Sequence, residues 1–131
     1  MINKKNAAFT LIEVLVATTI VAVLTAIGVV SYSSASRNSR DAKRLSDVEQ
    51  IRAALEMYRA DNGSYPGSID LSGSGELSSG TNVYMSPIPQ DPKYPTHFYI
   101  YSGSDDDYTL TIYLEKNSVN RCFGPLGEKG C

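Results

Sequence analysis

The sequence has little of what most catalytic sites require. Of its 131 residues, one is a histidine and two are cysteines. It has no glycine-rich phosphate-binding loop, and no serine or cysteine nucleophile is placed with a plausible histidine. The single histidine, His97, has no cysteine or aspartate at metal-ligand spacing, which favours an ordinary strand residue. These absences argue against an enzyme and against a transition-metal site.

A strong excess of charge of either sign is also absent. Twelve basic residues face fourteen acidic ones, for a formal net charge of −2. General nucleic-acid binding depends on neutralising phosphates with a basic surface, so the overall balance does not favour it. A local basic cluster at Arg37–Arg44 could contact DNA, lipid headgroups or acidic residues of a neighbouring chain. A solvated helix face near a membrane explains the same cluster without any ligand.

Residues 9–30 lack charge almost entirely, because Glu13 is the one ionisable residue among these 22. At 1.5 Å per helical residue the segment is about 33 Å long, enough to cross a bilayer. It is either a cleaved secretory signal peptide or a retained membrane anchor, and the length of the run favours the anchor. Lys4 and Lys5 predict a cytoplasmic N-terminus, whereas the basic residues that follow the segment oppose this assignment.

Neither proline nor glycine occurs between Ser31 and Asn62. Apolar residues recur there every three or four positions, which is typical of an amphipathic helix. Gly63 and Pro66 then supply a helix stop. The sequence therefore predicts one long helix from Phe9 to Asn62. Its apolar stripe consists of Leu45, Val48, Ile51, Leu55 and Tyr58.

The C-terminal half predicts a small β structure. Residues 63–95 hold five of the six prolines and predict an irregular loop with at most short strands, one near Val83–Met85. Two runs rich in aromatic and β-branched residues, 97–101 and 108–114, flank the polar segment SGSDDD and predict a hairpin over 97–114. In the second run one face carries apolar residues, which we expect to pack on the helix stripe. These residues are Leu110, Ile112 and Leu114. In the first run, Phe98 and Ile100 share one face and Tyr99 and Tyr101 share the other.

Both cysteines, Cys122 and Cys131, lie in the last ten residues and bracket a segment with glycine and proline. In an exported protein this pattern favours a disulfide that closes a short terminal loop. The alternative is two free thiols. On the chain-entropy model such a disulfide stabilises the fold by about 2–3 kcal/mol.

Three motifs carry a resemblance to a known family. A short basic leader with Ala8 at its end precedes Phe-Thr-Leu-Ile-Glu at Phe9–Glu13, and the apolar run follows. This pattern resembles the class III leader of type IV prepilins and type II secretion pseudopilins. The run YRADNGSYP at 58–66 is similar to the end of the long helix in pseudopilins and small pilins, and the terminal cysteine pair resembles the disulfide-bounded loop of type IV pilins. Ala8 stands where most members have glycine, and no proline interrupts the apolar stretch.

The resemblance implies a pilin-like α+β fold. In such a fold, a long N-terminal helix has a membrane-spanning first half and packs on a small antiparallel sheet with a disulfide-closed C-terminal loop. The implied division is a leader at 1–8, a transmembrane and filament-core segment at 9–30, an amphipathic continuation at 31–62 and a head at 63–131.

The resemblance also implies a maturation and assembly chemistry. A prepilin peptidase would cleave between Ala8 and Phe9, and the new amine of Phe9 would be N-methylated. That amine lies four residues from Glu13 and on the same helix face. A lone carboxylate in an apolar surrounding costs several kcal/mol, so the amine of a neighbouring subunit is a natural partner; the alternative is that Glu13 reaches the lipid headgroups. The filament core would be formed by Leu11, Ile12, Val14, Leu15, Val16, Ile20, Val21 and Leu24.

By resemblance, the chain is first a structural subunit of a type IV pilus or a pilus-like filament. A pseudopilin of a type II secretion system is the second hypothesis. A non-polymerising, membrane-anchored binding module with a groove in 63–95 is the third. The implied partners are copies of itself and other pilins, the peptidase, an inner-membrane assembly platform and, before assembly, membrane lipid. The precursor would cross the cytoplasmic membrane once with its N-terminus inside, and the product would be an extracellular or periplasmic filament.

The acidic run Asp105–Asp107 raises the question of calcium. Carboxylate oxygens are the ligands that Ca²⁺ prefers, and the resemblance implies a calcium site in the C-terminal region of major pseudopilins. The run lacks the alternating aspartates and central glycine of an EF-hand loop. A solvated hairpin turn is the simpler interpretation, and no other cofactor is expected.

Overall fold

The computed structural model describes residues 9–131. One helix, α1 (Leu11–Asn62), dominates them, as the absence of proline predicts. Its end agrees with the predicted stop: Gly63 has φ 79°, and its N–H donates to the carbonyl oxygen of Arg59 at 2.8 Å. A left-handed residue in this position is the common way to close a helix, and glycine adopts it without steric cost.

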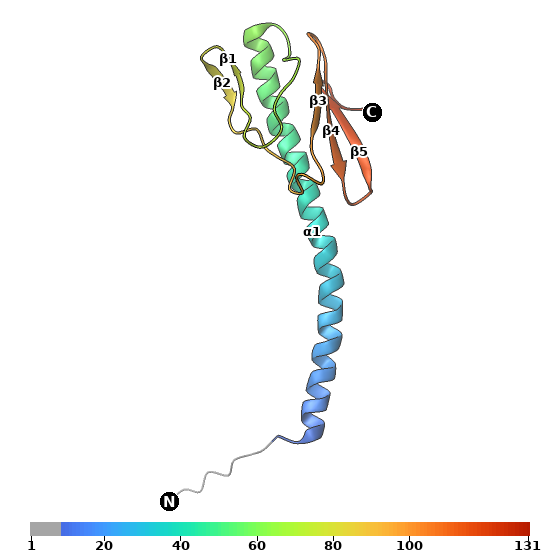
Figure 1. The fold of residues 1–131 in the computed structure, drawn as a ribbon. Coiled ribbons are helices and arrows are strands. Elements are labelled where there is room, and N and C mark those ends of the chain that lie inside the picture. Colours follow the sequence, from blue (N-terminus) through green and yellow to red (C-terminus); the bar gives the residue numbers. More distant parts are fainter. Residues whose placement is uncertain (1–8) are drawn as a thin grey trace, which may run out of the picture. The chain divides into compact units, whose positions relative to one another are not determined.

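The chain divides within α1 into two compact units, one ending at Ser36 and one running from Arg37 to Cys131. We call the second the head unit. It holds six strands: β1 (Leu77–Ser79), β2 (Asn82–Met85), β3 (Ile100–Gly103), β4 (Tyr108–Leu114), β5 (Val119–Gly124) and β6 (Gly127–Lys129). All pairings are antiparallel, in one sheet of order β1-β2 and another of order β3-β4-β5-β6. In Figure 1 the two sheets are drawn on opposite sides of the C-terminal half of α1. The predicted α+β, pilin-like architecture is confirmed.

The core forms where β4 packs on the apolar stripe of α1. The strand alternates strictly between buried and half-buried residues, and the predicted face of Leu110, Ile112 and Leu114 is the buried one. Of the predicted stripe, Val48, Ile51 and Leu55 are fully buried. The remaining two stripe residues, Leu45 and Tyr58, lie at the margin of the same cluster. Burying apolar side chains between a helix and a sheet is the main stabilising term of such a small unit.

The first strand of the predicted hairpin is shorter than expected, because β3 begins at Ile100 and not at His97. Tyr99 is buried and Tyr101 half-buried, whereas Phe98 and Ile100 face outward. The Tyr99 hydroxyl donates to Asp47 Oδ2 at 2.8 Å, and the Tyr101 hydroxyl donates to the Pro66 carbonyl oxygen at 2.8 Å. The inward-facing rings of Tyr99 and Tyr101 therefore both keep a partner for their hydroxyl groups.

The C-terminal segment is more regular than predicted. The expected terminal loop is a hairpin, in which β5 pairs with β4 on one side and with β6 on the other. Cys122, in β5, forms the predicted disulfide with Cys131 across a Cα–Cα distance of 5.2 Å. The disulfide therefore joins the end of the chain to an interior strand of the sheet.

Candidate functional site

The apolar part of α1 begins at a helix cap. The backbone N–H of Glu13 donates to Thr10 Oγ1 at 3.3 Å and to the Thr10 carbonyl oxygen at 3.1 Å. Thr10 is therefore the N-cap, and the helix begins at Leu11 and not at Phe9. The spacing Thr-x-x-Glu before an apolar run is the sequence signature of such a cap, and the sequence interpretation overlooked it. Glu13 in the first turn also interacts favourably with the helix dipole.

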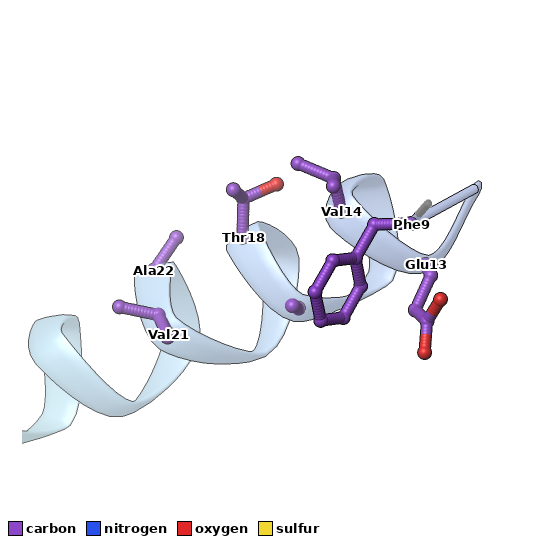
Figure 2. Close-up of a pocket in the computed structure, with 7 residues that line it drawn as sticks. Phe9, Glu13, Val14, Thr18, Val21 and Ala22 are labelled. Atoms are coloured by element: carbon purple, nitrogen blue, oxygen red, sulfur yellow. The ribbon is translucent and has the colours of Figure 1, made fainter. Parts of the chain in front are cut away.

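Phe9 and Glu13 share one surface of the helix. They border a shallow apolar hollow that continues along the helix. Figure 2 shows the Phe9 ring lying against the helix, while the Glu13 carboxylate points away from it. Among residues 9–131, the Glu13 carboxylate has no hydrogen bond or ion pair. The other lining residues are Val14, Ala17, Thr18, Val21 and Ala22.

The surface around Glu13 is apolar even where the helix carries threonine residues. The Thr18 hydroxyl donates to the Leu15 carbonyl oxygen at 3.0 Å, and the Thr25 hydroxyl donates to the Val21 carbonyl oxygen at 2.7 Å. Hydroxyls bound in this way within their own helix leave only methyl groups facing outward. Glu13 is thus the one polar group on the apolar segment that needs a partner from outside its own helix.

In the part of the chain that the structure describes, the side chains of this segment are exposed. Its large apolar side chains are exposed by about half or more, from 49% at Val16 to 83% at Leu11. Soluble monomers rarely leave so large an apolar area bare, so the segment is a binding surface for lipid or for other helices. By length and composition alone it could cross a membrane. Of the predicted processing residues, Phe9 lies at the start of this surface, and Ala8 lies outside the described residues.

The predicted solvated basic face at Arg37–Arg44 is wrong for Arg44. Its side chain is completely buried, and it binds Asp91 through two hydrogen bonds, Nε to Oδ2 at 2.7 Å and Nη2 to Oδ1 at 2.9 Å. Its Nη1 also donates to Asp41 at 2.8 Å and to Glu115 at 2.9 Å. Arg40 donates to both oxygens of the same Glu115, at 2.7 and 2.6 Å. These two arginines join α1 to the segment between β2 and β3 and to the β4–β5 turn, and both guanidinium groups are engaged within the head unit.

Two carboxylates of this cluster, Glu115 and Asp41, are held in the ionised state. Hydrogen bonds from Arg40, with further ones from Arg44 and Lys93, outweigh burial and hold the pKa of Glu115 far below its usual range. Burial alone would raise the pKa of Asp41, but the N–H groups of Glu115 and Lys116, both at 2.9 Å, lower it together with Arg44. The cluster therefore ties the helix to the β4–β5 turn through charges that persist at neutral pH.

The acidic run does not form the cation site that the resemblance implied. Asp106 faces Arg59 at 3.5 Å, and Asp107 pairs with Lys129 at 2.9 Å. Within residues 9–131, no three histidine, cysteine, aspartate or glutamate side chains gather closely enough to hold a metal ion. The residues present therefore do not fit a calcium site, since each of these two carboxylates is paired with a base instead of converging with the other.

Comparison with known proteins adds an independent line of argument. Residues 3–29 match the family described as the prokaryotic N-terminal methylation motif, and residues 31–120 match that of type II secretion system protein G. Three similar curated proteins are all named type II secretion system core protein G. The protein of Pseudomonas aeruginosa is 27% identical over 119 residues, covering 84% of each chain. That of Escherichia coli K12 is 26% identical over 96% of this chain and 86% of its own. That of Aeromonas hydrophila is 32% identical over 70% of this chain and 71% of its own. No solved structure matches.

Proposed function

We propose that this chain, which belongs to the type II secretion system protein G family, is a pseudopilin, the structural subunit of a secretion filament. The sequence by itself placed the type IV pilus subunit first and the pseudopilin second. The relatives favour the second hypothesis, because each is named as a core protein of a secretion system. The proposed role is structural, and we assign no reaction to the chain.

The observation that carries the proposal is the bare apolar segment of α1 with one unpaired carboxylate. Before assembly, lipid covers the segment, and in the filament the same segments of neighbouring copies cover one another. Because lipid is already apolar, this exchange by itself provides little driving force. A polar contact that exists only between copies can supply both attraction and register, and Glu13 is the group available for it.

The maturation steps follow as part of the proposal. Residues 1–8 are a leader that a prepilin peptidase removes between Ala8 and Phe9, and the Phe9 amine is then methylated; residues 3–29 match the methylation motif as a whole. The amine of one copy pairs with Glu13 of the next. Residues 9–30 form the filament core, 31–62 extend the helix and 63–131 form the outer head.

The proposed partners and location follow from the same picture. The precursor is a single-pass protein of the cytoplasmic membrane with its N-terminus inside, in contact with the peptidase and an assembly platform. The product is a periplasmic filament built from copies of this chain and from other pilin-like subunits. The buried state of Arg44 and the pairing of Arg40 support a head without a nucleic-acid surface in this region.

The test is complementation in cells of the source organism from which the gene for this chain has been deleted. Glu13→Gln removes the charge at nearly constant shape, and Thr25→Val is the matched control, because its hydroxyl is already bound within the helix. Losing one partner of a buried pair costs about 3–5 kcal/mol, so we expect Glu13→Gln to reduce cross-linked multimers and secreted protein at least tenfold. The control should remain at the wild-type level, with both variants inserted and cleaved normally. Full secretion by Glu13→Gln would refute the assembly role.

The choice of machine is tested in the same deletion strain. If the chain is a pseudopilin, exported proteins should accumulate in the periplasm of the deletion strain while surface pili remain. Loss of surface pili with normal secretion would instead restore the type IV pilus hypothesis.

A further inference from the structure

Two backbone carbonyl oxygens of the acidic turn between β3 and β4, residues 104–107, already accept hydrogen bonds from the protein. The Asp105 carbonyl oxygen accepts the N–H of Tyr65 at 3.0 Å. The Asp107 carbonyl oxygen accepts the N–H of Ser104 at 2.7 Å and its hydroxyl at 3.0 Å. A hard cation needs six to eight oxygen ligands, and these carbonyls are among the ones that a turn would offer.

Lys129 takes the place that a cation would have on this turn. Its ammonium group donates to Asp107 Oδ2 at 2.9 Å and to the Tyr108 carbonyl oxygen at 2.6 Å. A carboxylate and a backbone carbonyl are the two ligand types that calcium sites combine. The contact also holds the pKa of Asp107 below its ordinary value, through the hydrogen bond from Lys129.

The C-terminal hairpin fixes the position of this lysine. Lys129 lies opposite Cys122 in the pairing of β5 with β6, and Cys122 is bonded to Cys131, two residues beyond Lys129. Gly124 leaves room for the lysine stem, because a Cβ there would lie 3.1–3.2 Å from its last three side-chain atoms. Pairing, disulfide and glycine together direct the ammonium group to the turn.

We propose that Lys129 is the built-in cation of the acidic turn and that the Cys122–Cys131 disulfide holds it there, so that the head unit keeps its fold without a bound divalent cation. The inference rests on the proposed function in one respect, since the expectation of calcium comes from the pseudopilin family. It predicts that the head depends on its disulfide and not on calcium.

The first test is thermal unfolding of the full chain in detergent, in 1 mM CaCl₂ and in excess EGTA. A ligand that binds only the folded state raises the melting temperature in proportion to its binding free energy. We expect the two melting temperatures to agree within about 1 °C, whereas a calcium-bound fold would separate them by about 5 °C or more. A separation of that size would overturn the proposal. The result does not depend on assembly, so it is independent of whether the chain forms a filament.

The second test assigns the role to Lys129. Lys129→Met removes the ammonium group, and Lys116→Met is the control, because Lys116 is an exposed lysine in the β4–β5 turn. Since Lys129 is partly exposed, we expect its loss to lower the melting temperature by about 3–6 °C and the control to change it by about 1 °C or less. Equal shifts in the two variants would contradict the assignment.

The third test asks whether the disulfide positions the lysine. In a chain carrying Cys122→Ser and Cys131→Ser, the lysine is no longer fixed, so Lys129→Met should lower the melting temperature by less than half as much as in the oxidised chain. Groups that act together show such non-additivity, whereas independent groups add. Fully additive shifts in melting temperature would show that the disulfide does not position Lys129.

Discussion

Replacing Arg44 tests the physical account of the head unit most severely. In Arg44→Met, Glu115 keeps Arg40 and Lys93, and Asp41 keeps its two backbone donors. Asp91, whose side chain is 1% exposed, keeps the N–H of Lys93 at 2.7 Å but loses its cation. One buried carboxylate without a counter-charge costs about 3–5 kcal/mol. Because small domains are stable by only about 5–15 kcal/mol, the variant should lose a large share of its stability.

The assay is urea unfolding of the full chain in detergent, followed by tyrosine fluorescence. Arg37→Met is the matched control: it also removes an arginine from α1, but that side chain is exposed, so its loss should cost less than about 0.5 kcal/mol. If the loss comes from Asp91, then Arg44→Met combined with Asp91→Asn should recover most of it, because the amide keeps an acceptor and carries no charge. A loss for Arg44→Met within 1 kcal/mol of the control would refute the reasoning.

Three further predictions concern the head unit. The folded pKa of Glu115 lies below its unfolded value of 4.5, so the stabilisation from this carboxylate is complete above about pH 5 and is lost as pH falls. Glu115→Gln should therefore lower the stability of the head unit at pH 7 and make that stability depend less on pH in acid. An unchanged slope in acid unfolding, followed by circular dichroism, would contradict this. Reducing the Cys122–Cys131 disulfide, which spans 9 positions, should cost about 2–3 kcal/mol in urea unfolding, whereas no shift in the midpoint would contradict its role. Gly103→Ala should cost about 1–3 kcal/mol, because its Cβ would overlap the Pro66 carbonyl oxygen, whereas Gly67→Ala meets no atom and should be near neutral; equal costs in the two variants would argue against this packing.

The features that the sequence predicts well are those with local signals. The end of α1 at Asn62 follows from Gly63, whose backbone conformation closes the helix. The buried face of β4 follows from alternation, because every second residue is aliphatic. The N-cap at Thr10 was equally local and could have been predicted from its spacing to Glu13.

The features that escape prediction depend on distant partners. Arg44 looks like part of a solvated basic face, because Asp91 and Glu115 lie 47 and 71 residues away in sequence. The segment Val119–Lys129 looks like a loop because glycine, proline and charge interrupt it. The pairing of β5 with β4, and of β6 with β5, overrides that weak strand preference.

The orientation of β3 shows a third reason why part of the fold cannot be predicted from sequence. Alternation divides Phe98 and Ile100 from Tyr99 and Tyr101, but both faces are apolar enough to be buried. What decides between them is the hydroxyl partner that each tyrosine finds in the fold, and no pattern within the strand contains it.

The most direct test of the central claim is the intact mass of the chain recovered from the membranes of the cells that produce it. The account predicts a species that begins at N-methylated Phe9 and is two mass units lighter for one disulfide. A chain that still carries residues 1–8 under conditions of active secretion would contradict maturation, and with it assembly through the Phe9 amine and Glu13.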